Sequence, residues 1–142
     1  MDKQDIRDAG LKVTVPRTRI LEILSQPDAR HMTADLIYQR LHEEQDTVSL
    51  ATVYRVLLDF ENAGLVVRHQ FENGHAVFEL NLGKHHDHLV CINCGRIVEF
   101  HNDAIERQQK LIAEASGFEI RHHSLTIYGV CGDRGCRGAR NS

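Results

Sequence analysis

The densest group of metal-binding side chains lies in ten consecutive residues, His85 to Cys94, which read HHDHLVCINC. The apolar and β-branched residues inside this stretch favour a strand, in which side chains point alternately to the two faces. His86 and His88 therefore share one face, and His85 and Asp87 share the other. The alternation predicts parts of two different metal sites, one on each face of the strand.

Two pairs of cysteines suggest a further site. Cys91 and Cys94 end the histidine-rich stretch, and Cys131 and Cys136 lie near the C-terminus, each pair in a turn that contains glycine. Four thiolates arranged in this way suit one tetrahedral zinc ion. The alternative is a redox pair, but a redox Cys-x-x-Cys normally opens a helix, and here a strand is expected to follow. We therefore predict a structural zinc site.

Spacing alone leaves open which residues complete the two histidine sites. Adjacent imidazoles repel one another when protonated, so the clustered histidines favour a bound cation. Histidines that stand alone in the sequence are expected to be solvated or structural: His42, His69, His75 and His101. The candidates for the missing ligands are His31, Glu79, Glu99, Glu106, His122 and His123.

Composition limits the class of protein. The chain has 142 residues, 42% hydrophobic and 26% charged, as in an ordinary globular protein. It has no run of about 18 apolar residues and no signal-like N-terminus, so we expect a cytoplasmic protein without membrane contact. Thiols stay reduced there, which favours metal binding over disulfides. Residues 1–82 carry 9 Lys and Arg against 13 Asp and Glu, a net of −4, so DNA binding must depend on local placement of charge.

The N-terminal part is predicted to hold four helices and a hairpin. Helices are expected at 5–10, from Pro16 to Gln26, after a Thr33 N-cap and from a Ser49 N-cap to Gly64. The buried stripe of the third includes Leu36, Ile37 and Leu41, and that of the fourth includes Val53, Val56, Leu57 and Phe60.

The hairpin is predicted from strands at 65–71 and 76–80. With Asn73 and Gly74 as its two loop residues, Val67 pairs with Leu80 and Arg68 lies opposite Glu79. Helices followed by such a hairpin indicate a winged helix-turn-helix, with the fourth helix entering the major groove of DNA and the hairpin acting as the wing. The exposed Tyr54 and Arg55 at the start of that helix favour DNA binding over a merely solvated face.

After a hinge at about 81–84, the C-terminal part is expected to form strands at 86–92 and 96–101, a helix at 103–116 and a strand at 118–130. The fold class is thus α+β, with a winged-helix domain at 1–82 and a metal-binding domain at 83–142. A unit this small usually needs a metal or a partner subunit for stability.

Several motifs in order resemble the ferric uptake regulator family. They are LKVTVPR at 11–17, ATVYRVL at 51–57, HHDHLVCINCG at 85–95, IVEF at 97–100 and HSLTIYG at 123–129. The resemblance covers residues from about 11 to 136. It implies a homodimeric, metal-dependent repressor that binds AT-rich palindromic operators of iron-uptake genes, with no enzymatic activity and no small-molecule substrate. Pairing of dimers into tetramers is left open.

The resemblance also implies a role for each candidate. Structural zinc is assigned to Cys91, Cys94, Cys131 and Cys136. The regulatory metal is assigned to His31, Glu79, His86 and His88, with Glu99 nearby. A second site in the dimerisation domain is assigned to His85, Asp87, Glu106 and His123. The expected DNA contacts are Lys12, Arg17, Thr52, Tyr54 and Arg55.

Two departures from related branches bear on the sensed metal. Peroxide sensors of the family tend to have aspartates where this chain has Glu79 and Glu99, and zinc sensors use a sensory cysteine that is not found here. Both favour Fe²⁺, replaceable in vitro by Mn²⁺, Co²⁺ or Zn²⁺. The alternatives are a family sensor of Zn²⁺, Mn²⁺ or peroxide, a zinc enzyme that uses His86 and His88, and a metal store without sequence-specific DNA binding.

Overall fold

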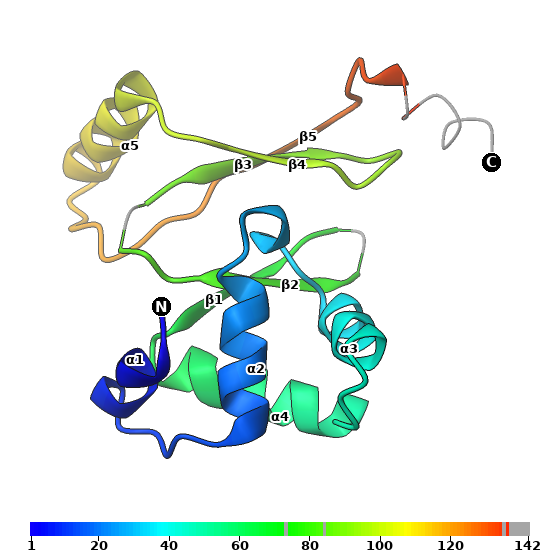
Figure 1. Cartoon of the computed structure of the whole chain (residues 1–142). Helices are drawn as coiled ribbons and strands as arrows, with labels where there is room; N and C mark the ends of the chain where they lie inside the picture. Colours follow the sequence, from blue (N-terminus) through cyan, green and yellow to red (C-terminus); the bar gives the residue numbers. More distant parts are fainter. Residues whose placement is uncertain (73, 84, 135, 137–142) are drawn as a thin grey trace. The chain divides into compact units, whose positions relative to one another are not determined.

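The computed structural model describes residues 1–72, 74–83, 85–134 and 136. The chain divides into two compact units, Met1–Gly83 and Lys84–Ser142. In the described part of the chain, no helix is long and apolar enough to span a membrane. Figure 1 shows helices and a hairpin in the first unit, and a sheet with one helix in the second.

The N-terminal unit contains helices α1 to α4 and a two-stranded sheet. In chain order these are α1 (Lys3–Asp8), α2 (Val15–Leu24), a 3₁₀ turn (Pro27–Ala29), α3 (Ala34–Glu43), α4 (Leu50–Asn62), β1 (Val66–Gln70) and β2 (Ala76–Leu80). The predicted caps Thr33 and Ser49 are confirmed: each side chain accepts a hydrogen bond from a backbone N–H of its helix. Such caps satisfy donors that a helix start otherwise leaves unpaired.

One apolar core holds this unit together. Val53, Val56, Leu57 and Phe60 of α4 are buried in it, as their helical spacing predicts. The prediction for Leu36 was wrong, since 44% of this residue is exposed. Helix α3 is short and packs on α2 and α4 through Ala34, Ile37 and Leu41, so its buried stripe is narrower than the apolar pattern suggests.

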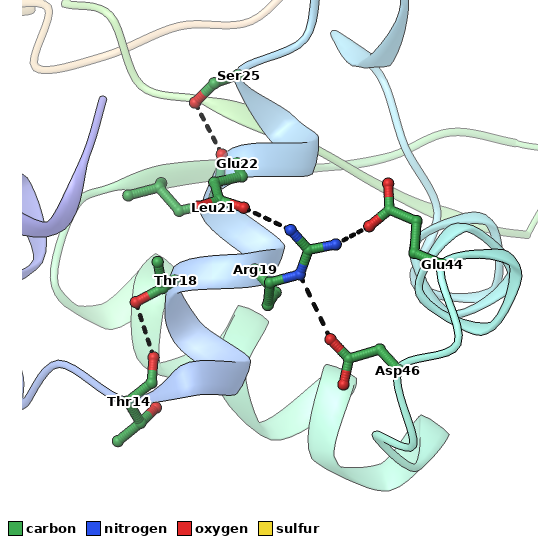
Figure 2. Close-up of polar contacts among 8 residues, drawn as sticks. All are labelled: Thr14, Thr18, Arg19, Leu21, Glu22, Ser25, Glu44 and Asp46. Atoms are coloured by element: carbon green, nitrogen blue, oxygen red, sulfur yellow. Dashed lines mark hydrogen bonds and ion pairs between the residues drawn. The ribbon is translucent and has the colours of Figure 1, made fainter.

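Arg19 ties α2 to the connection between α3 and α4. Its guanidinium reaches three carboxylates: Glu22 at 2.7 Å, Asp46 at 3.4 Å and Glu44 (Figure 2). Gln45, between two of these acids, has a left-handed backbone with φ 61°. A single surface ion pair contributes little to the free energy of folding. Three carboxylates on one arginine form a network, which restrains the connection before α4.

The register of the hairpin differs from the prediction. Val66 pairs with Leu80 and Gln70 with Ala76, so five residues rather than two join the strands. Phe71 is buried and leaves the ladder, and its carbonyl accepts a hydrogen bond from Gly74, whose φ of +85° suits a glycine. Asn73 lies outside the described residues. The shift moves every cross-strand pair by one residue, so Arg68 faces Phe78 and instead pairs with Glu61 at 3.0 Å.

The C-terminal unit has a three-stranded sheet in the order β4-β3-β5. Its elements are β3 (Asp87–Cys91), β4 (Ile97–Phe100), α5 (Asp103–Ala115) and β5 (Thr126–Gly129). The central β3 runs antiparallel to β4 and parallel to β5. The predicted strand at 118–130 was too long, because only its last third pairs with β3 and residues 118–125 contain no strand.

The core of the N-terminal unit yields the first prediction. Phe60→Ala should lower the free energy of unfolding by about 3–5 kcal/mol, because it removes a fully buried aromatic side chain and leaves a cavity. Leu58→Ala on the same helix, where 44% of the residue is exposed, should change it by less than about 0.5 kcal/mol. Urea unfolding followed by circular dichroism measures both, and equal losses would contradict this packing.

Candidate metal centres

The four cysteines converge at one end of the C-terminal sheet. Parallel pairing places Gly129 beside Cys91, and the amide of Ile92 donates to the Gly129 carbonyl at 2.9 Å. The chain beyond β5 therefore returns next to the turn that follows β3. Each of the four residues offers a sulfur within 4.8 Å of the other three.

The distances between sulfurs match a metal site rather than disulfides. Cys91 and Cys136 sulfurs lie 3.4 Å apart, and those of Cys94 and Cys131 lie 3.6 Å apart. A disulfide requires about 2.05 Å. Four thiolates at 2.3 Å from a zinc ion form a tetrahedron with edges of about 3.8 Å. The cluster therefore fits zinc.

The surroundings of the thiols also favour a cation. Backbone N–H groups, first that of Cys131 and then that of Cys94, lower the pKa of the Cys91 thiol to about 5. Burial, and then the neighbouring Cys91 thiol, raises the pKa of Cys136 to about 12. Four thiolates cannot share this space without a positive charge, and a divalent ion supplies it.

A second cluster combines His85, just before β3, with groups from β3, α5 and the segment before β5. His85 Nε2 lies 3.1 Å from Asp87 Oδ1 and 3.4 Å from Glu106 Oε1, while His123 Nε2 lies 3.0 Å from Glu106 Oε2. The four ligand atoms gather within 4.8 Å of one another. His122, which the sequence left as a candidate ligand beside His123, is exposed and is not part of this group.

Burial of Asp87 tests whether this second cluster fits a metal. The residue is 0% exposed, and its Oδ2 atom has no hydrogen-bond partner in the described part of the chain. A buried carboxylate with one oxygen left unpaired is costly unless a cation compensates it. Two imidazoles and two carboxylates form an N/O ligand set that suits Mn²⁺, Fe²⁺ or Zn²⁺.

The expected regulatory ligands form a partial group in each unit. In the N-terminal unit, Met32 and Phe78 exchange backbone hydrogen bonds at 3.0 and 2.8 Å. This isolated bridge places their chain neighbours His31 and Glu79 together, with His31 Nε2 at 3.2 Å from Glu79 Oε2.

The other expected ligands meet in the C-terminal unit. Antiparallel pairing sets His88 opposite Glu99. His86 Nε2 lies 3.5 Å from Glu99 Oε1, and the His86 and His88 rings lie 4.9 Å apart. The face alternation expected for the strand therefore groups these two histidines apart from His85 and Asp87.

His69 is the residue that sequence reasoning missed. Its Nε2 lies 2.5 Å from Glu79 Oε1, while His31 Nε2 lies 3.2 Å from Glu79 Oε2. In the observed register His69 pairs with Val77, which makes Glu79 its diagonal neighbour. The two-residue loop predicted from the sequence hid this contact.

The expected DNA contacts differ in how free their side chains are. Lys12 and Arg55 are exposed, and Tyr54 is 43% exposed. The Thr52 hydroxyl accepts a hydrogen bond from the hydroxyl of the N-cap Ser49, with 3.0 Å between the two oxygens. Arg17 is only 19% exposed, and its guanidinium is engaged within the N-terminal unit.

The cysteine cluster generates the second prediction. Cys91→Ser combined with Cys94→Ser should remove one tightly held zinc ion per chain and unfold the C-terminal unit, since structural zinc contributes roughly 10–16 kcal/mol. Metal analysis under reducing conditions and NMR amide dispersion measure the two effects. His85→Ala, outside the cysteine cluster, is the control and should retain that zinc. A folded, zinc-free double variant would disprove the structural role.

Comparison with known proteins finds relatives along nearly the whole chain. The pattern of the ferric uptake regulator family matches residues 8–128. The ferric uptake regulation protein of Vibrio vulnificus is 52% identical over 137 residues, which cover 96% of this chain and 92% of that protein.

Two crystal structures are similar as well. The ferric uptake regulator of Vibrio cholerae has a TM-score of 0.85 and 51% identity, covering 90% of this chain and 98% of that one. The regulator of Pseudomonas aeruginosa with manganese has a TM-score of 0.79 and 47% identity, covering 94% and 99%. Sequence and fold therefore agree over nearly the whole chain, and this chain belongs to the ferric uptake regulator family.

Proposed function

We propose that this chain is an iron-dependent transcriptional repressor that binds operator DNA as a homodimer in the cytoplasm. Membership of the family makes it a transcriptional regulator and not an enzyme. The observation that carries the proposal is the division of the regulatory ligands. His31 and Glu79 belong to one unit, and His86, His88 and Glu99 belong to the other.

This division explains how a metal can control DNA binding. In this proposal His31 and Glu79 of one unit and His86 and His88 of the other would hold one ferrous ion, which would restrain the hinge at 81–84 and thus the angle of each reading head. Heads held at the spacing of successive major grooves bind a palindrome without a further ordering cost. Without the ion, only a fraction of the dimers has the competent arrangement, and the apparent affinity falls by that fraction.

The reading head is the N-terminal unit. Helix α4 buries one face in the core and exposes Tyr54 and Arg55 near its N-terminus, which is the end of a recognition helix that usually contacts bases. We assign base contacts to these two residues and to Thr52. Lys12 is exposed and is assigned to the minor groove, as the family resemblance implies.

The ligand types support iron as the signal. Histidine nitrogens and carboxylate oxygens form the site, with glutamate at both 79 and 99 and no cysteine among them. Such a set binds Zn²⁺ more tightly than Fe²⁺ in isolation, so selection depends on which metal is available in the cell. We assign zinc to the four cysteines, Fe²⁺ to the regulatory ligands, and a further divalent ion to the group of His85.

Exposed apolar residues support a homodimer. Within the described C-terminal unit only three apolar residues are buried: Val90, Cys91 and Cys136. Large apolar side chains are instead exposed on α5, after it and across the sheet: Leu89, Ile92, Val98, Leu111, Ile112, Phe118, Ile120, Ile127 and Val130. A surface of this kind normally marks an interface.

The sheet shows the same pattern in one row. Val98, Leu89 and Ile127 are cross-strand neighbours on β4, β3 and β5, and each is 37–43% exposed. This row of apolar side chains crosses the whole sheet and stays partly exposed in the single chain. Such a row suits burial against a second copy of the chain. The family resemblance implies the same assembly.

The third prediction tests metal sensing. Glu79→Ala combined with His86→Ala should abolish metal-stimulated operator binding and leave the dimer intact. Even outer groups of metal sites change metal affinity by about 10- to 100-fold, so loss of two ligands should exceed that range. Fluorescence anisotropy with an AT-rich palindromic duplex, with and without Mn²⁺ under reducing conditions, measures binding. His42→Ala, outside all three sites, should respond as wild type; full stimulation of the double variant would refute the assignment.

The fourth prediction tests the dimer. Ile112→Glu places a charge on a residue that is 65% exposed in the single chain and should be buried in the dimer, so the variant should be monomeric at micromolar concentration. Val15→Glu, at a 69% exposed site in the N-terminal unit, is the control and should stay dimeric. Sedimentation equilibrium gives the masses. If the Ile112→Glu protein is still a dimer, α5 is not part of the dimer interface.

A further inference from the structure

Arg17 lies at the start of α2, where it could be taken for a phosphate contact, yet its guanidinium faces two groups of its own unit. Nη1 donates to the Lys12 carbonyl at 2.8 Å, and Nη2 donates to Asp59 Oδ2 at 3.1 Å. Its backbone N–H also donates to the Thr14 hydroxyl at 3.3 Å, as part of the N-cap of α2. Both terminal nitrogens of the side chain are thus already engaged.

One of these contacts holds the segment that carries Lys12. Gly10 has φ +82°, and the amide of Leu11 donates to the Ile6 carbonyl at 3.1 Å, which closes the end of α1. Leu11 and Val13 pack against the core on either side of Lys12. The Lys12 side chain therefore points outward, while its carbonyl is held by Arg17.

The other contact reaches the reading helix. Asp59 lies four residues after Arg55 and seven after Thr52 on α4, so these three residues share one face of the helix. A bare carboxylate on a face that approaches DNA would repel phosphates. Arg17 neutralises this charge and at the same time connects it to the Lys12 segment.

We propose that Arg17 is a positioning residue: it links Asp59 of α4 to the Lys12 backbone and so sets the minor-groove lysine at a constant distance from the reading helix. This inference rests on the proposed function, because it assumes that Lys12 and α4 bind DNA together. The link between Arg17, Asp59 and Lys12 does not itself distinguish one DNA base from another. It keeps two separate contacts in register, so that both can form without reordering the 11–14 segment.

The role requires arginine rather than positive charge alone. A planar guanidinium can donate to two acceptors in different directions, whereas the ammonium of lysine acts as a single point charge. Lysine is nevertheless a good phosphate ligand. Arg17→Lys therefore separates the two roles: it preserves a phosphate contact and breaks the link.

Asp59→Ala separates them by the sign of its effect. If charge alone matters, removing an acid from α4 and releasing Arg17 should tighten DNA binding. If Arg17 positions Lys12, the same change should weaken it. Alanine favours a helix more than aspartate does, so weaker binding cannot be attributed to loss of α4. Glu61→Ala is the matched control, since it also removes an acid of α4, one that pairs with Arg68.

The experiment uses the full-length protein loaded with Mn²⁺ and a duplex that the wild type enriches from a randomised library. We expect Asp59→Ala and Arg17→Lys each to weaken binding by about threefold to tenfold, as for residues coupled through one network. In a Lys12→Ala background neither change should have a further effect. Thermal unfolding should stay close to that of the wild type, and Glu61→Ala should bind as well as or better than the wild type.

Two results would overturn the inference. If Asp59→Ala binds DNA as well as or better than the wild type, or if Arg17→Lys binds as the wild type does, Arg17 does not position Lys12. Arg17 then either contacts DNA directly or takes no part in DNA binding. Effects of the same size in the Lys12→Ala background would show that Lys12 is not the group being positioned. If the wild type enriches no duplex at all, the proposed function fails and this inference fails with it.

Discussion

The parallel pairing of β5 with β3 is the interaction on which the C-terminal unit depends. At one end, Cys91 lies beside Gly129, which brings the last two cysteines to the first two. At the other end, His88 donates its backbone N–H to the Leu125 carbonyl at 3.1 Å, so that the preceding His123 reaches Glu106. A slip of one residue would exchange the faces of β3 and separate both ligand groups. One strand register thus brings together the ligands of two candidate metal sites.

This arrangement carries a cost in stability that other parts of the protein must offset. The described C-terminal unit buries few apolar side chains and places a buried carboxylate, Asp87, where a larger unit would have core. Packing alone contributes little in such a unit. Zinc at the cysteine cluster can offset this, and burial of the exposed apolar row of the sheet in the proposed dimer would add to it. Folding of this half of the molecule is therefore expected to depend on metal binding and on the proposed dimer.

The N-terminal unit faces a different electrostatic problem, since a head with a net charge of −4 has to approach DNA. Six of its acids lie against an arginine: three on Arg19, and one each on Arg17, Arg40 and Arg68. The pairs on Arg17 and Arg19 also tie α2 to α4 and to the connection before it. Lys12 and Arg55 remain on the surface. These ion pairs therefore restrain the head, while its net charge stays at −4 and DNA binding depends on where the remaining cations lie.

The sequence alone determined the features that depend on local periodicity and on side-chain type. Helical spacing identified the buried face of α4, polar residues identified the caps at Thr33 and Ser49, and strand alternation separated His86 and His88 from His85 and Asp87. Local patterns also predicted which cysteines pair in turns. These properties are set within a few residues of chain, so they can be derived without knowing the fold.

Only the tertiary structure decided the features that depend on how distant segments align. The five-residue hairpin loop shifted the register and brought His69 to Glu79, where the local Asn-Gly signal had predicted a two-residue turn. The last strand is shorter than predicted, because only Thr126–Gly129 pairs with β3, and the segment before it places His123, not His122, beside Glu106. The contacts of the Arg17 guanidinium with Asp59 and with the Lys12 carbonyl also became visible only in the fold, while its predicted contact with DNA stays a prediction. Pairings across long stretches of chain leave no periodic pattern, and they are set by packing and hydrogen bonding in the folded protein.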